Sequence, residues 1–171
     1  VDLYWGGAHC CFIGLIFSFD GSGYRVAEHN FADPGYRLGD LDGDGTTEFL
    51  TGDYRFAYRY TSFASSIFPV QVYGWAGGRL FDETSFYEDR IRADVKRNWK
   101  IFVHMRGTAY EPRGAAAAWA ADRYRLGQRA STLHALRRLA RQGRLAGFPV
   151  RSPLKWVSKL DRDLRRLGYD G

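Results

Sequence analysis

The first half of the chain is best understood from the stretch YRLGDLDGDGTTEFLT, residues 36–51. Within it, Asp40, Asp42, Asp44 and Glu48 place four carboxylates in nine residues around two glycines. Ca²⁺ takes about six to eight oxygen ligands at about 2.3–2.6 Å, so a short loop can surround it only when alternate side chains turn inward. The stretch therefore predicts a calcium loop.

The position of each residue in the loop predicts which of its oxygens would bind the ion. Asp40, Asp42 and Asp44 would offer side-chain oxygens at positions one, three and five. The glycine at position six permits a sharp turn, so the carbonyl at position seven can face the ion. Glu48, at position nine, would close the shell directly or through a water. The expected metal ligands are therefore Asp40, Asp42, Asp44, Thr46 and Glu48.

The residues on either side of the loop exclude an EF-hand. Position twelve is Thr51, where an EF-hand carries a bidentate glutamate, and residues 36–38 and 49–51 alternate as strands rather than helices. A loop without that glutamate is a weak site, useful where calcium is about millimolar. We therefore expect a structural calcium ion in a secreted, periplasmic or cell-envelope protein. The alternative is a surface turn that is simply rich in Asp and Gly.

The D-x-D-x-D-G-x-x-[DE] pattern between strands resembles the calcium loops of FG-GAP and VCBS-type repeats, which occur in blades of integrin-like β-propellers. The likeness runs from Tyr36 to Leu50, and the motif occurs once in this chain. The order GGAHCCF, DLDGDGTTEF, GDYRFAYRY and then a helical tail is similar to uncharacterised secreted bacterial proteins with a single loop of this kind. The resemblance implies calcium binding and brings no established activity.

Residues 1–84 predict an antiparallel β module with propeller-blade-like hairpins. Apolar runs over 8–19 and 24–31 flank the turn at 20–23, and strands over 36–38 and 48–53 flank the calcium loop. A further hairpin joins 70–73 to 79–81 through Gly77-Gly78. Residues 54–68 are long and aromatic, which fits either a large loop over the sheet or an irregular pair of strands.

Residues 85–171 predict a basic bundle of about four helices. The capping box Ser85-Phe86-Tyr87-Glu88 opens the first helix, which Gly107 ends. Further helices are expected over 113–126 and 131–142, and Ser152-Pro153 opens the last helix, which Gly168 ends. The fold class is therefore α+β, with the helices expected to pack on the sheet.

Charge divides the chain unequally. Residues 1–89 carry a net charge of −8 and residues 90–171 a net charge of +14. The cations of the later helices suit the solvated side of amphipathic helices, a nucleic acid or anionic membrane surface, or the acidic β half. Without a recognised nucleic-acid motif, the solvated side is favoured. These cations are Arg137, Arg138, Arg141, Arg144, Arg151, Lys155, Lys159, Arg162, Arg165 and Arg166.

Other candidate sites are weaker. No two histidines have the spacing of a metal motif, and no nucleophile elbow, Walker loop or dinucleotide fingerprint is present, so we expect no catalytic residue. Asp53 and Arg55 fit an ion pair better than a substrate cleft. The alternation Tyr54, Phe56, Tyr58 and Tyr60 would place rings on one sheet face, either as core or as a glycan-stacking surface.

Cys10 and Cys11 are the only cysteines and are adjacent, which fits one buried and one exposed thiol on a strand, or a strained vicinal disulfide. No apolar run is long enough to cross a membrane. Taken together, the sequence predicts a calcium-stabilised, extracytoplasmic binding or structural module without catalytic activity. Polyanion binding by the basic helices and glycan binding by an aromatic β face are the alternatives.

Overall fold

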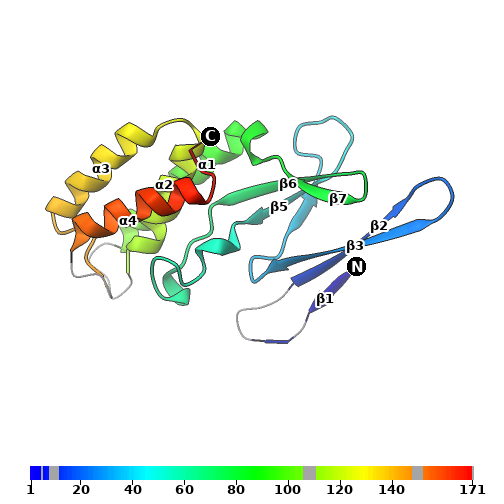
Figure 1. The fold of residues 1–171 in the computed structure, drawn as a ribbon, viewed down its shortest axis with the longest axis horizontal. Helices are drawn as coiled ribbons and strands as arrows, with labels where there is room; N and C mark the ends of the chain where they lie inside the picture. The colour runs from blue at the N-terminus through cyan, green and yellow to red at the C-terminus, as the bar shows by residue number, and fades with distance from the viewer. Residues whose placement is uncertain (5, 8–11, 106–110, 148–151, 171) are drawn as a thin grey trace. The chain divides into compact units, whose positions relative to one another are not determined.

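A computed structural model describes residues 1–4, 6–7, 12–105, 111–147 and 152–170 (Figure 1). The chain forms two compact units. The first contains residues 1–54 and 70–87, and the second contains residues 55–69 and 88–171. Antiparallel strands in the first unit and helices in the second confirm the predicted α+β class. Cys10 and Cys11 lie outside the described residues.

The described residues of the first unit form two antiparallel sheets, with strand orders β1-β2-β3 and β4-β5-β6-β7. The strands of the first sheet are β1 (Asp2–Tyr4), β2 (Phe12–Phe19) and β3 (Tyr24–Ala32). Those of the second are β4 (Arg37–Gly39), β5 (Glu48–Gly52), β6 (Val70–Ala76) and β7 (Arg79–Asp82). The β6–β7 turn has φ values of +58° and +80° at Gly77 and Gly78, as the predicted hairpin requires.

An aromatic cluster joins the two sheets of the first unit. Phe31, on β3, is 3% exposed, and its ring centre lies 5.6 Å from that of Phe49 on β5 and 4.3 Å from that of Tyr36. His29 adds an edge contact to Tyr73 on β6, with ring centres 5.2 Å apart. Ring pairs of this kind stabilise beyond the area that they bury. The cluster therefore anchors β5, the strand that follows the candidate calcium loop.

The far end of the β2–β3 hairpin exposes apolar side chains. Phe17 pairs with Val26 and Phe19 with Tyr24 across the two strands, and all four side chains are at least half exposed. Residues two apart on a strand share a face, so these four form one apolar surface.

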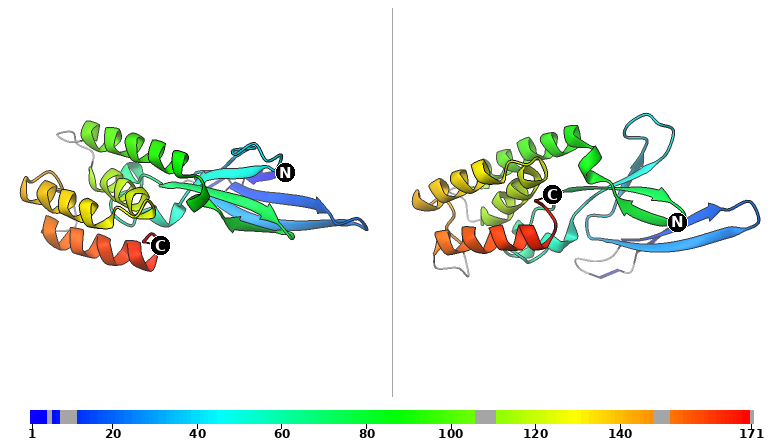
Figure 2. Two further views of the ribbon diagram at one scale, coloured as in Figure 1. Left: turned by 90° about the horizontal axis from the view of Figure 1, so that it is seen from above. Right: turned by 45° about the horizontal axis from the view of Figure 1, so that its top comes forward.

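The described residues of the second unit form four α-helices (Figure 2). They are α1 (Glu88–Met105), α2 (Arg113–Arg125), α3 (Arg129–Arg141) and α4 (Pro153–Arg166). Ser152 caps α4 as predicted, because its hydroxyl accepts a 3.4 Å hydrogen bond from the backbone nitrogen of Lys155. No helix among the described residues is long and apolar enough to cross a membrane.

The start of α1 differs from the prediction. The capping box at Ser85 is wrong, because residues 84–86 form a separate 3₁₀ turn and the α-helix begins at Glu88. The side chain of Thr84 accepts a 3.0 Å hydrogen bond from the backbone nitrogen of Val72, which holds this turn against β6. This contact between Thr84 and Val72, twelve residues apart in the chain, keeps residues 84–86 in the 3₁₀ turn, so the α-helix starts later, at Glu88.

Residues 55–69 belong to the helical unit. The expected alternation of rings on a sheet face is wrong, because the segment contains 3₁₀ turns (Tyr54–Phe56 and Phe63–Ser65) and Tyr58 has a φ of +56°. Phe56 and Tyr60 are buried in the core of the helices, whereas Tyr58 is exposed. The aromatic β face of the glycan hypothesis is therefore not formed by these residues.

The alanine run of α2 lets this helix pack closely on its neighbours. Residues 115–118, 120 and 121 are at most 2% exposed. At the start of the helix, Gly114 meets the 55–69 segment so closely that an added Cβ would lie 2.0 Å from the carbonyl oxygen of Ser65. Only glycine fits this contact.

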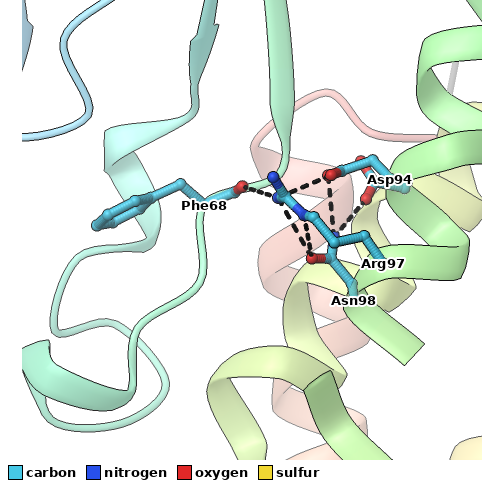
Figure 3. A network of polar contacts seen from close by, with 5 residues as sticks. Phe68, Asp94, Arg97 and Asn98 are labelled. Carbon is cyan, nitrogen blue, oxygen red and sulfur yellow. Dashed lines mark hydrogen bonds and ion pairs between the residues drawn. The ribbon is translucent and has the colours of Figure 1, made fainter. Parts of the chain in front are cut away.

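A buried polar network joins α1, α2 and residues 55–69 (Figure 3). Asn98 Nδ2 donates to Asp94 Oδ2 at 3.0 Å and to Asp122 Oδ2 at 2.8 Å. Arg97 pairs with Asp94 at 2.7 Å and donates to the carbonyl of Phe68 at 3.3 Å. Burial, and then the negative charge of Asp94, raise the pKa of Asp122 well above its ordinary value.

Candidate metal centre

The predicted calcium loop joins β4 to β5. Gly39 pairs with Glu48 at the open end, so the loop enters and leaves at neighbouring positions of the sheet. Gly43 and Gly45 have φ values of +83° and +88°, which a residue with a Cβ rarely adopts. The predicted strand flanks are thus confirmed, and the two glycines produce the tight turn between them.

Three of the predicted ligands lie together. One carboxylate oxygen from each of Asp40, Asp42 and Glu48 lies within 4.8 Å of the others. Calcium–oxygen distances of about 2.3–2.6 Å allow two ligands of one ion to be up to about 5 Å apart. Glu48 is only 2% exposed, whereas the two aspartates face solvent. The spacing and the hard oxygen donors fit Ca²⁺.

Backbone amides hold these carboxylates in place. Asp40 accepts hydrogen bonds from the nitrogens of Gly43 at 2.7 Å and Gly45 at 3.1 Å. Glu48 Oε2 accepts from the nitrogen of Leu41 at 2.7 Å, across the base of the loop. Because each oxygen has further lone pairs, these bonds orient the carboxylates without using up their capacity to bind a cation.

Asp44 and Thr46 form a separate part of the loop. Asp44 Oδ1 accepts hydrogen bonds from both the nitrogen and the hydroxyl of Thr46, each at 2.7 Å, and these bonds hold the pKa of Asp44 below its usual value. The Thr46 hydroxyl also donates to Glu48 Oε1 at 3.1 Å. The structure therefore does not place Asp44 within the three-carboxylate cluster, and its role as a ligand, like that of the Thr46 carbonyl, stays a prediction.

Tyr87 is a neighbour of the cluster that the sequence did not reveal. Its hydroxyl donates to Asp42 Oδ2 at 3.4 Å, and the residue is 6% exposed. Burial and the negative charges of Glu48, Asp42 and Glu83 raise the pKa of Tyr87. Tyr87 is far from the loop along the chain, and its sequence neighbourhood suggested only a helix start.

Glu83 adds negative charge near Tyr87. Its carboxylate lies against Gly74 of β6, where an added Cβ would be 2.1 Å from Oε2. The negative charges of Glu48, Asp42 and Glu83 all disfavour ionisation of the Tyr87 phenol and so raise its pKa. A bound cation would offset their mutual repulsion.

No family model matches the chain, and no solved structure matches it. Two curated bacterial relatives do. An uncharacterised protein of Sinorhizobium fredii is 31% identical over 129 residues, which cover 73% of this chain and 20% of the relative. A "probable thylakoid lumen protein" of Synechocystis is 30% identical over 131 residues, which cover 73% of this chain and 38% of the relative. The chain therefore spans less than two fifths of the length of either relative.

Proposed function

We propose that the first unit is a calcium-stabilised binding or structural module without catalytic activity. The observation that supports this most directly is the cluster of Asp40, Asp42 and Glu48, whose oxygens lie within 4.8 Å of one another. Glu48 is almost fully buried; it accepts hydrogen bonds from Leu41 and Thr46, and a cation would further offset the cost of burying its charge.

The ion would be held by Asp40, Asp42 and Glu48, with Asp44 and Thr46 completing the set. The bound ion would supply two positive charges, which would neutralise the negative charge of the loop carboxylates. Asp40 and Glu48 lie at opposite ends of the loop, so an ion that bound both would tie β4 to β5. Calcium that binds only the folded loop stabilises it by mass action.

We place the protein outside the cytoplasm, in the cell envelope, an internal lumen or the exterior. A weak oxygen site is filled only where free calcium is high. The lumenal name of the Synechocystis relative agrees with such a compartment.

Calcium should raise the melting temperature of the protein by several degrees. At about 30 to 100 times the dissociation constant, a ligand adds about 2 to 2.7 kcal/mol to the free energy of unfolding. The measurement is scanning calorimetry of the full chain after EDTA treatment, with and without added CaCl₂, together with a calorimetric calcium titration. MgCl₂ serves as the ion control.

Asp42→Asn should abolish both the heat of binding and the calcium-dependent shift, because the amide lowers the negative charge of the cluster. Asp33→Asn is the matched control: it removes one exposed carboxylate from a turn of the same unit, and it should respond to calcium as the wild type does. Coincident melting curves in CaCl₂ and EDTA, or an unchanged titration for Asp42→Asn, would refute the calcium proposal.

A further inference from the structure

Three arginines of α3 and one in the turn that follows it have no acidic partner in the described part of the chain. The sequence of α3, RASTLHALRRLAR, contains no acidic residue. Arg137, Arg138 and Arg141 are exposed, and in the described part of the chain none of them forms an ion pair. Arg144, in the turn after the helix, is also exposed and has no ion pair there. We call these four residues the α3 arginine face.

Some other cations of the second unit are paired with acids. Arg92 pairs with Glu88 at 2.8 Å, and Lys159 pairs with Asp163 at 2.7 Å. Arg129, at the start of α3, pairs with Asp161 of α4 at 2.8 Å. The absence of such partners on the α3 arginine face leaves its positive charges to repel one another.

The face points away from the helical core. The buried residues of α3 are Thr132, Leu133, Leu136, Leu139 and Ala140. At 100° per residue, Arg138 and Arg141 fall on the opposite side of the helix, and Arg137 falls on its flank. The arginines are therefore free of any packing role, and their charge is available to a partner.

The neighbouring helix adds charge of the same sign. α3 and α4 lie side by side in all views (Figures 1 and 2). Exposed cations of α4 lie opposite its own buried stripe of Trp156, Val157, Leu160 and Leu164. They are Lys155, Arg162, Arg165 and Arg166.

We infer that the α3 arginine face is a docking surface for the phosphate headgroups of an anionic phospholipid membrane. The planar guanidinium binds phosphate oxygens through two parallel hydrogen bonds, which suits arginine to this ligand. Clusters of cations bind anionic lipids with about 1 kcal/mol, or about fivefold in affinity, for each Lys or Arg near the surface. The interaction is peripheral, and it does not depend on the calcium proposal.

A lipid surface fits this face better than a nucleic acid does. Proteins that bind single-stranded nucleic acid add aromatic rings on which bases stack. Among the described residues of α3 and α4, no Phe, Tyr or Trp side chain is exposed, the exposed ring of α3 is the imidazole of His134, and the one exposed large hydrophobic residue is Leu154. An array of arginines without exposed Phe, Tyr or Trp rings matches a sequence-free phosphate surface.

Co-sedimentation of the full chain with vesicles tests this inference. Vesicles of phosphatidylcholine with about 30% phosphatidylglycerol, in about 0.1 M NaCl, should bind the protein, whereas pure phosphatidylcholine should not. Arg137→Gln, Arg138→Gln and Arg141→Gln together should weaken binding about a hundredfold. The matched control removes three exposed cations from α1, as Arg90→Gln, Lys96→Gln and Lys100→Gln, and it should bind within about fivefold of the wild type.

Several results would overturn the assignment. They are no binding to the anionic vesicles, an equal loss in the α1 control, and binding that survives about 0.5 M NaCl. The last result would instead implicate the apolar end of the β2–β3 hairpin. Tighter binding to an oligonucleotide than to the vesicles, in the same buffer, would reject lipid as the occupant. Circular dichroism of the triple variant must match the wild type, so that a loss of binding is not a loss of fold.

Discussion

Gly114→Ala is expected to destabilise the helical unit by about 3 kcal/mol, although alanine is the better helix former. The added methyl would lie 2.0 Å from the carbonyl oxygen of Ser65 and 2.8 Å from Thr61 Cγ2. Backbone cannot move aside as a flexible side chain can, so α2 and the 55–69 segment would have to separate. A helix-propensity gain of up to about 1 kcal/mol does not offset that cost.

The measurement is thermal unfolding followed by tryptophan fluorescence. Three of the five tryptophans, Trp99, Trp119 and Trp156, lie in the second unit, so most of the signal follows that unit. The expected fall in melting temperature is about 10–20 °C. Ala93→Gly, at an exposed position of α1, is the control for propensity alone and should cost about 1 kcal/mol. A Gly114→Ala protein as stable as the wild type would show that the close approach does not exist.

Asp122→Asn should stabilise the helical unit at neutral pH and leave it nearly unchanged near pH 4. Burial and the charge of Asp94 raise the pKa of Asp122 in the folded protein, so the folded state retains a proton that the unfolded state releases above about pH 4. Stability is therefore lost as pH rises from the unfolded pKa to the folded pKa, by up to about 1.4 kcal/mol per pH unit. The amide of asparagine stays neutral throughout and removes this loss.

Urea unfolding of wild type and Asp122→Asn from pH 4.5 to pH 8 measures the difference directly. Asp161 does not confuse the result, because its pKa is lowered by Arg129 and its contribution is lost only below the unfolded value of about 4. Asp89→Asn, an exposed carboxylate at the start of α1, should show a constant difference from the wild type over the same range. A constant difference for Asp122→Asn as well would contradict a raised pKa.

Local features of the fold follow from short stretches of sequence. Gly77-Gly78 supplies the positive φ of the β6–β7 turn, and Ser152-Pro153 caps and starts α4. The alanine-rich stretch gives α2 at the predicted place. In each case the deciding interaction joins residues within one turn of the chain, so no knowledge of distant neighbours is needed.

The candidate metal centre was predictable in part for the same reason. Alternating carboxylates and the loop glycines indicate the cluster of Asp40, Asp42 and Glu48, and the structure brings these three together. The spacing of the residues does not predict that Asp44 accepts hydrogen bonds from Thr46, because several hydrogen-bond partners are possible in such a loop. Tyr87 reaches Asp42 only because the 3₁₀ turn before α1 is held against β6, and no local pattern reports that contact.

The sequence by itself determined the two kinds of structure, the calcium-loop pattern and the places where most helices begin and end, because these depend on backbone dihedral angles and local hydrogen bonds. The tertiary structure decided that residues 55–69 belong with the helices, that Gly114 must lack a side chain, and that Asp122 lies beside Asp94. It also left Arg137, Arg138 and Arg141 of α3 without acidic partners in the described part of the chain. These outcomes depend on which surfaces meet when apolar area is buried, and contacts between distant residues are not encoded in any one stretch of the chain.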